Sequence, residues 1–336
     1  MTRSFFLFLL AFTLGNNLAY SQGSVLNCTD SAFCVPGVVG LPRSKGIEIK
    51  REIIRDYAIR SSSSEGFGNA QAEVLRNRRW SLKARFPIVA KDNITIAAGV
   101  KYFVEEFNFE NPESIDYSFY NNLEDKSLKS LRTDLFIMKP TRTNKYFLLR
   151  LSAGLNGDYT ADNQATTDFL RFSIAPLMGW KKNDYVSYAV GVAYSYSFGR
   201  RSIVPIVAYN KTFNNQWGIE SVLPAEAKLR YNTLNQKNYV YLKAQLDGSN
   251  YGIRLDDQID EITYLEKSEV RVLLCWEREI HDWLWFSLES GFRSNIDFDL
   301  SDSPTLNSDE LIQNDLNVAF TYGFSIFVVA PRKFLK

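Results

Sequence analysis

The chain has 336 residues, and its 39 Lys and Arg against 38 Asp and Glu give a net charge of +1, which offers no electrostatic reason to expect a nucleic-acid partner. Aromatic residues make up 14% of the sequence, yet the mean hydropathy is only −0.21. After the first residues no apolar run reaches the length of about 18 that a membrane-spanning helix needs. A β-barrel is not excluded, because its strands need only about 9 to 11 residues each.

The first residues carry the pattern of a secretory signal. Arg3 supplies a positive charge, residues 5–14 are almost entirely apolar, and residues 19–21 (Ala-Tyr-Ser) have a spacing that signal peptidase accepts. An uncleaved anchor helix is the alternative, but the apolar run is too short to span a bilayer. We therefore expect a cleaved signal peptide at 1–21, a periplasmic arm at 22–45 and an outer-membrane domain at 46–336.

Three cysteines bear on redox chemistry and metals. Cys28 and Cys34 lie in the segment NCTDSAFC just after the expected cleavage site, and an exported compartment permits a disulfide between them, although the sequence does not decide whether they pair. Cys275 is left over. No CxxC motif or histidine cluster indicates zinc, so we expect no metal site.

The segment 186–198, VSYAVGVAYSYSF, alternates between two kinds of side chain. Every second residue from Val186 to Phe198 is large and apolar or aromatic, whereas the residues between them, from Ser187 to Ser197, are all Ser, Ala or Gly. Because successive side chains of a strand point to opposite faces, this pattern predicts a strand with one apolar face and one face of small residues. The same period recurs at 316–328, and at 79–88 the second face is charged.

Similar alternation extends along most of the remaining chain, at 47–60 (weakly), 94–105, 131–138, 146–156, 168–180, 203–210, 238–248, 268–280 and 283–295. Helical periodicity is nearly absent, so the fold class is all-β. Strands of a soluble sandwich typically have about five or six residues, whereas most of these run to roughly 10 to 15. Long strands with a polar second face favour a transmembrane antiparallel up-and-down β-barrel, with apolar residues toward lipid and polar residues toward the lumen.

The connections between strands support this architecture. Short turns are expected on one side, at 90–93, 140–144, 181–184 and 213–216, and the longer links 61–76, 107–127 and 157–166 on the other, as in outer-membrane barrels. Pro224 cannot donate to a strand ladder, so we divide 217–232 into two short strands. This gives about 14 strands with both termini in the periplasm, and a 12-stranded barrel with this hairpin folded aside is the alternative.

Several quoted features give the chain its resemblance to a known group of proteins: the signal sequence, the alternating strands, the segment WGIESVLPAEAKLRYNTLNQKNYVYL (217–242) and the last strand VAFTYGFSIFVV (318–329). Aromatic residues are also expected at both rims: Trp180, Trp217, Trp276 and Trp283 near the periplasmic ends, and Trp80, Tyr194, Tyr196 and Phe198 near the outer ends. The chain thus resembles the uncharacterised, porin-like outer-membrane β-barrel families of Gram-negative bacteria. The last strand resembles a signal for the barrel-assembly machinery.

The alternation also predicts which charged residues face the lumen. Its basic members are Arg79, Lys83, Arg85, Lys101, Arg132, Arg150 and Arg171, and its acidic members on the strands 268–280 and 283–295 are Glu269, Glu277 and Glu289. Charges of opposite sign on different walls of a narrow lumen would select small polar or anionic solutes. Alternatively, these charges pair and close a barrel that conducts nothing, because each unpaired charge in a dry lumen costs several kcal/mol.

The functional expectation is a porin-like channel for small hydrophilic solutes, possible anions among them, without a cofactor. Outer-membrane lipid, lipopolysaccharide and the assembly machinery are the expected partners. The alternative is a closed structural or adhesion barrel whose loops bind a surface partner, with the segment 108–125, NFENPESIDYSFYNNLED, as the binding loop, although the same residues could fold into the barrel mouth. We expect no enzyme, because the single histidine, His281, lies in a turn and no GxSxG motif occurs.

Overall fold

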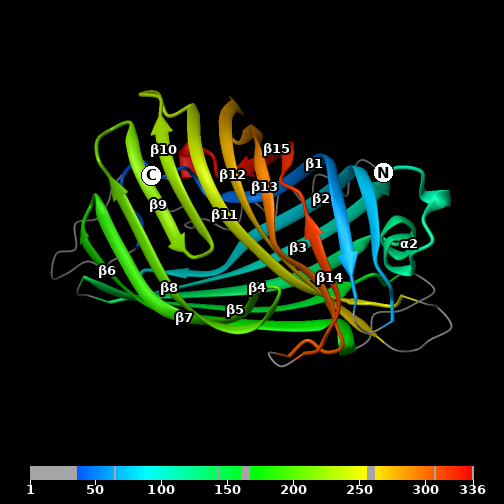
Figure 1. Ribbon diagram of the computed structural model, residues 1–336. Coiled ribbons are helices and arrows are strands. Elements are labelled where there is room, and N and C mark those ends of the chain that lie inside the picture. The colour runs from blue at the N-terminus through cyan, green and yellow to red at the C-terminus, as the bar shows by residue number, and fades with distance from the viewer. Residues whose placement is uncertain are drawn as a thin grey trace, which may run out of the picture.

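The computed structural model describes residues 36–63, 66–141, 144–159, 167–255, 262–305 and 308–334. In these residues one antiparallel sheet closes on itself to form a barrel (Figure 1). The expected signal peptide (1–21) and the two cysteines Cys28 and Cys34 lie outside the described residues.

Each strand pairs with its neighbours in the sequence, and the barrel closes where the last strand pairs with both the first and the thirteenth. The strands are β1 (Lys45–Ser62), β2 (Ala70–Lys91), β3 (Ile94–Phe109), β4 (Leu128–Pro140), β5 (Lys145–Gly157), β6 (Leu170–Asn183), β7 (Val186–Phe198), β8 (Arg200–Thr212), β9 (Trp217–Leu223), β10 (Glu226–Asn232), β11 (Asn238–Ile253), β12 (Thr263–His281), β13 (Leu284–Ser301), β14 (Glu310–Leu316) and β15 (Ala319–Val329).

The barrel has 14 strand positions, because β14 and β15 are two segments that both lie between β13 and β1. The hairpin of β9 and β10 belongs to the wall, since β9 pairs with β8 and β10 with β11. The expectation of an all-β barrel with 14 strands is therefore confirmed, and the 12-stranded alternative is wrong. The strands are interrupted at Pro224 and near Asn317, so that each of two sequence segments forms two strands instead of one.

The described helices are few and short: η1 (Pro112–Ser114), α2 (Ser118–Asp125), η2 (Thr167–Phe169) and η3 (Arg332–Phe334). Helix α2 was not predicted, because two turns give too few apolar repeats to stand out from an alternating sequence. No helix of the described residues has the length and apolar character needed to cross a membrane.

The two ends of the barrel differ in their connections. At the end that we call the turn end, short turns join β2 to β3, β4 to β5, β6 to β7, β8 to β9, β10 to β11 and β12 to β13. The opposite loop end carries most of the longer links and α2, which lies at the right of Figure 1. The four turns predicted from the sequence all lie at the turn end, as do the start of β1 and the end of β15.

The outer surface of the barrel is apolar and its inner surface is mostly polar. On β7, Val190 and Val192 are 46% and 49% exposed, whereas Ser187 and Ala189 are fully buried inside, as the alternation predicts. The inner face of this region is small because it accommodates Tyr146. That ring packs against Gly179, where a Cβ would collide with it, and its hydroxyl lies 2.8 Å from the hydroxyl of Ser187.

The tryptophans expected at the turn end lie there, and Trp180 stacks on Tyr188 with ring centroids 5.5 Å apart. Trp80 departs from the expectation. It lies near the middle of the 22-residue strand β2 and not at the outer end of that strand. The guanidinium of Arg51 covers the Trp80 ring, 5.1 Å from its centroid.

The β9–β10 hairpin is too short to separate its neighbours along their whole length. β9 and β10 have 7 residues each, whereas β8 has 13 and β11 has 16. Beyond the hairpin tip, residues 200–206 of β8 and 247–253 of β11 have no partner in the hairpin. Unpaired strand edges are unfavourable at membrane depth, so another part of the wall must cover them.

The ends of β5 and β7 fill this gap by packing directly against β11, and we call this contact the seam. Gly157 and Gly252 are register partners, and the amide of Asp158 donates to the Gly252 carbonyl at 3.2 Å. Gly248 approaches the backbone of Ser197 so closely that a Cβ would collide with its carbonyl. The β7–β8 tip is held there as well, because the Asn250 amide donates to the Gly199 carbonyl at 3.1 Å.

The assignment of faces predicts unequal effects of the same substitution at two adjacent positions. Ile174 is 42% exposed on the outer surface of β6, whereas Ser173 lines the lumen opposite Ser152. Ile174→Lys should reduce the stability of the barrel folded in phospholipid vesicles, measured as its free energy of unfolding, by about 2 kcal/mol, because it places an ammonium group in lipid. Ser173→Lys should change it much less. Equal losses in urea titrations of the two variants would refute the assignment.

Candidate functional site

The interior of the barrel contains a cavity of about 880 Å³ that is lined mainly by charged and polar side chains. The structure places all ten predicted lumen residues on its lining: Arg79, Lys83, Arg85, Lys101, Arg132, Arg150, Arg171, Glu269, Glu277 and Glu289. They do not form one uniform surface. Some are bound in ion-pair networks and others face the open part of the cavity, and a role in selectivity remains a prediction for all of them.

An apolar cluster closes the loop end above this cavity. From α2, Phe119, Tyr120 and Leu123 are buried against inward side chains such as Ile54 of β1 and Phe298 of β13. Burial raises the pKa of the Tyr120 phenol to about 12, and its hydroxyl lies 2.7 Å from that of Ser61. The aromatic residues of the segment 108–125 therefore pack in the barrel mouth and are not displayed on the surface.

Below the apolar cluster, an ion-pair network crosses the lumen. Glu52, Arg79 and Glu105 are direct register partners on β1, β2 and β3, so charges of alternating sign face one another along the sheet. Arg79 Nε donates to Glu105 at 2.9 Å, and its Nη2 donates to Glu269 of β12 at 2.7 Å. Lys267 of β12 also bonds to Glu105. These charges are buried and paired, which is the arrangement that a closed lumen requires.

The wall formed by β1 and β11–β13 is also balanced in charge. Arg271 binds Glu52 at 2.7 Å, and Lys45 binds Glu277 at 2.9 Å. Glu289 is shared by Lys50 and Lys243. The three predicted acidic residues of the lumen, Glu269, Glu277 and Glu289, are thus all neutralised by neighbouring cations.

The wall formed by β2–β5 is different, because it carries a surplus of positive charge. Lys83, Lys101 and Arg132 are register partners on three adjacent strands, and Arg85 and Arg150 lie one and two rows nearer the turn end. We call these five residues the cationic wall. Large parts of its side chains are accessible, with exposed fractions of 47% for Lys83 and 41% for Arg150.

Few carboxylates balance the cationic wall. Asp134 lies 2.8 Å from Arg150 and 3.4 Å from Arg132, and Glu48 lies 3.4 Å from Lys83.

Arg85 and Lys101 form no ion pair with any residue that the structure describes. Their charged groups instead lie 4.3 Å and 5.2 Å from the ring centroids of Phe136 and Phe103, respectively.

Arg171 occupies a different environment from the other predicted cations. It lies at the edge of the cavity in the seam, where its Nε donates to Asn250 Oδ1 at 2.9 Å and its guanidinium lies 5.3 Å from the Tyr264 ring. It is only 7% exposed. Its contacts therefore join β6 to β11 and β12, and its guanidinium group is largely inaccessible to a solute in the cavity.

The residues before β1 lie across the turn end, and we call residues 38–43 the arm. The amide of Val39 donates to the Asp184 carbonyl in the β6–β7 turn at 2.9 Å, and Gly40 accepts from Arg230 and Asn232 of β10. Arg43 then reaches Asp282 in the β12–β13 turn at 3.2 Å. Because these turns lie on nearly opposite sides of the barrel and residues 41–43 line the cavity, the arm forms part of its floor.

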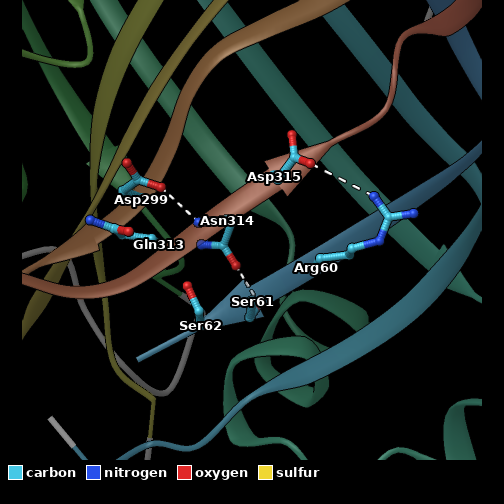
Figure 2. A pocket seen from close by; sticks show the side chains of 7 residues that line it. All are labelled: Arg60, Ser61, Ser62, Asp299, Gln313, Asn314 and Asp315. Carbon is cyan, nitrogen blue, oxygen red and sulfur yellow. Dashed lines mark hydrogen bonds and ion pairs between the residues drawn. The ribbon is translucent and has the colours of Figure 1, made fainter. Parts of the chain in front are cut away.

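A smaller pocket of about 370 Å³ lies at the loop end between β1, β13 and β14. Figure 2 shows that its residues bind one another: Ser61 donates to the Asn314 side chain, the Asn314 backbone amide donates to Asp299, and Arg60 faces Asp315 at 3.7 Å. These contacts attach β14 to both neighbouring strands. The pocket is therefore a by-product of barrel closure and presents no converging set of free polar groups.

The groups considered for catalysis and metal binding do not assemble into a site. His281 packs beside Trp283 with ring centroids 5.7 Å apart, and it forms no hydrogen bond to a described serine or threonine. Cys275 is buried, 3.9 Å from Glu289. In the part of the chain that the structure describes, no group of three or more His, Cys, Asp or Glu side chains could hold a metal ion.

Sequence reasoning missed several lumen residues, most clearly those of β1. Glu48 and Glu52 occupy alternate positions of that strand, which is the signal that identified the other lumen residues. Arg51 obscured the pattern, because it is a charged residue on the outer face. Its guanidinium lies over Trp80 at 5.1 Å, which explains how the outer surface tolerates it. The arm carried no periodic signal, so its place in the lumen was not predictable from the pattern.

Comparison with known proteins identifies a family and several similar folds. A family model described as a domain of unknown function (DUF6268) matches residues 54–326, in agreement with the resemblance to uncharacterised barrel families. No curated protein matches the chain significantly.

Three of the solved structures that match come from bacteria. The P. putida toluene transporter TodX is 9% identical, with a TM-score of 0.36, and the match covers 86% of this chain and 91% of TodX. The COG4313 outer membrane channel from Pseudomonas putida F1 is 12% identical, with a TM-score of 0.36 and coverages of 86% and 96%. The translocator domain of autotransporter NalP from Neisseria meningitidis is 9% identical, with a TM-score of 0.34 and coverages of 84% and 88%. Scores this low support no argument about the solute.

The position of the arm predicts a specific effect of adding one methyl group. Gly40 has a φ of +80°, and a Cβ there would lie 2.9 Å from Arg230 Nη1, so Gly40→Ala should release the arm. Trypsin should then cleave after Arg43, whose side chain is buried in the folded protein. Gly37→Ala is the matched control, because a Cβ at Gly37 meets nothing within 4 Å. Equal cleavage rates for both variants and the wild type would contradict the described anchoring.

Proposed function

This chain belongs to the family described as a domain of unknown function (DUF6268), and we propose that it is an outer-membrane channel for small hydrophilic anions, closed at its loop end in the present conformation. The cationic wall is the observation that carries this proposal. A barrel with a purely structural role would gain nothing from charges such as Arg85 and Lys101, which line an accessible cavity without a carboxylate partner. Rings of like charge in a pore favour passage of the opposite ion.

The mechanism requires no covalent step and no cofactor. An anion that enters the cavity exchanges part of its hydration for the guanidinium and ammonium groups of β2–β5. Because the opposite wall is balanced in charge, the field across the lumen attracts anions toward the cationic wall. Passage to the other side then requires displacement of α2 or opening of the seam, since the apolar cluster and the Arg79 network fill the loop end.

A closed barrel is the second candidate, and the packing of the loop end favours it. The apolar cluster and the cross-lumen network together leave the loop end filled by residues of α2 and nine strands. An adhesion role for the segment 108–125 has less support, because its aromatic side chains Tyr117, Phe119 and Tyr120 are buried.

The proposal includes the cellular setting. Large apolar side chains cover the outer surface on every side of the barrel, which suits contact with lipid. Residence in the outer membrane would require the expected signal peptide and delivery to the barrel-assembly machinery. Strand β15, which resembles the signal for that machinery, is also the strand that closes the barrel.

Conductance of the purified protein in planar bilayers tests the proposal. Replacing residues 111–126 with a short Gly-Ser linker should increase conductance, because it removes most of the apolar cluster contributed by the loop. The open state should prefer anions, and the double variant Arg85→Gln with Lys101→Gln should reduce that preference. Lys228→Gln is the matched control, because Lys228 is a lumen residue with a carboxylate partner, Glu226, at 2.7 Å.

A folded barrel that stays silent even without residues 111–126 would support the closed-barrel candidate. Steps with no ion preference, or with a preference that the Arg85 and Lys101 changes leave intact, would contradict the assigned role of the cationic wall.

A further inference from the structure

We propose that the cationic wall is a binding site for an oxyanion with two or more negative charges, such as a phosphate ester or a polycarboxylate. As a statement about the transported solute, this inference rests on the function proposed above. Binding itself can be measured on a barrel that conducts nothing. The site comprises Lys83, Arg85, Lys101, Arg132 and Arg150, on four adjacent strands of one wall.

The first argument is the repulsion within the row formed by Lys83, Lys101 and Arg132. Like charges directly opposite one another on neighbouring strands destabilise a sheet. Two of these strands, β2 and β3, show the favourable arrangement four residues away, where Arg79 and Glu105 alternate in sign with Glu52 of β1. The protein therefore has one compensated row and one uncompensated row in the same wall. A bound anion would supply the missing negative charge between the strands.

The second argument is the size of the charge surplus. The five cations of the wall face two carboxylates, Glu48 and Asp134, so the wall carries a net surplus of three positive charges. The next carboxylate, Asp247, is itself bound to Arg271. A monovalent anion would balance only a part of this surplus, whereas an anion with two or more charges would interact with several of these cations at once. The inference therefore specifies the charge of the ligand.

The third argument is the geometry of the donors. Arg85 and Arg150 both lie against Phe136, with their Cζ atoms 4.3 Å and 5.5 Å from the ring centroid, so a single aromatic side chain restrains two guanidinium groups. The guanidinium group of Arg132 is restrained by Asp134, because its Nε lies 3.4 Å from Asp134 Oδ2. Restrained guanidinium groups can bind oxyanions through two parallel hydrogen bonds, which is a preference for carboxylate and phosphate over halide.

The fourth argument is the space above the wall. Gly99 and Gly154 occupy inward positions of β3 and β5, beside Asp134 and Arg132 respectively, and carry no side chain that would fill the cavity. The surface between the cations is therefore a shallow floor of backbone. An oxyanion can lie on this floor within reach of side chains from both β2 and β4.

Thermal unfolding of the refolded protein in detergent tests the inference without any need for conduction. Pyrophosphate and citrate are the probes, and sodium chloride of equal ionic strength is the reference. A ligand that binds only the folded state raises Tm in a saturable way. Pyrophosphate or citrate should therefore raise the Tm of the wild type, and the chloride reference should not. If only one of the two probes acts, the inference stands and the site belongs to the phosphate or the carboxylate class.

Two variants separate binding at the cationic wall from binding elsewhere. Lys101→Gln should raise Tm in the absence of ligand, because it relieves repulsion in the row, and it should abolish or strongly reduce the shift caused by the probe. Lys228→Gln, at a paired lumen lysine, should retain the full shift. A wild type that responds no more to pyrophosphate and citrate than to chloride would overturn the inference, and so would an undiminished shift in Lys101→Gln.

The outcomes also distinguish this inference from the proposed function. A saturable shift that depends on Lys101, in a protein that never conducts, would preserve the binding site and remove the channel. Anion-selective conductance that pyrophosphate does not block at any concentration, in a protein without a Tm shift, would preserve the channel and remove the site.

Discussion

The seven-residue strands of the β9–β10 hairpin are the constraint on which the shape of the lumen depends. A barrel wall needs every strand edge paired, and this hairpin leaves half of β11 without its neighbour. The ends of β5 and β7 cover that edge at glycine positions that permit close approach, Gly157, Gly248 and Gly252. The loop half of the barrel is thereby narrowed, and α2 with its aromatic residues is sufficient to fill what remains of the mouth.

The turn half holds most of the cavity, and the charges that line it are unevenly distributed in a way that the fold alone does not require. Near the middle of the barrel, Glu52, Arg79 and Glu105 show that neighbouring strands can be matched in sign. Four residues further toward the turn end on each of β2 and β3, Lys83 and Lys101 face each other without such matching. A row of this kind lowers stability unless something else compensates the charge, and an accessible cavity of about 880 Å³ provides the room for a solute to do so.

The sequence predicted the parts of this protein that depend on a period of two. The apolar and small faces of β7, the turns at one end and the lumen position of Lys83 or Arg132 all follow from alternation. Whether a charge is paired could not be predicted, because Arg79 and Glu269 are 190 residues apart in the sequence and meet across the lumen. The seam could not be predicted either, because it depends on how the ends of β5 and β7 meet β11 beyond the hairpin that contains Pro224. Nor could the position of the arm, because its contacts are mostly made by single backbone groups.

The most direct test is to measure from which end of the barrel a reagent can reach the cationic wall. A Lys101→Cys variant in a background without native cysteines should react with a membrane-impermeant thiol reagent added to the turn end, and should be protected from reagent added to the loop end by the packed α2 and the seam. Removing residues 111–126 should add reactivity from the loop end. Equal labelling of the intact barrel from both ends, or no labelling from either, would contradict an accessible cationic cavity closed at its loop end.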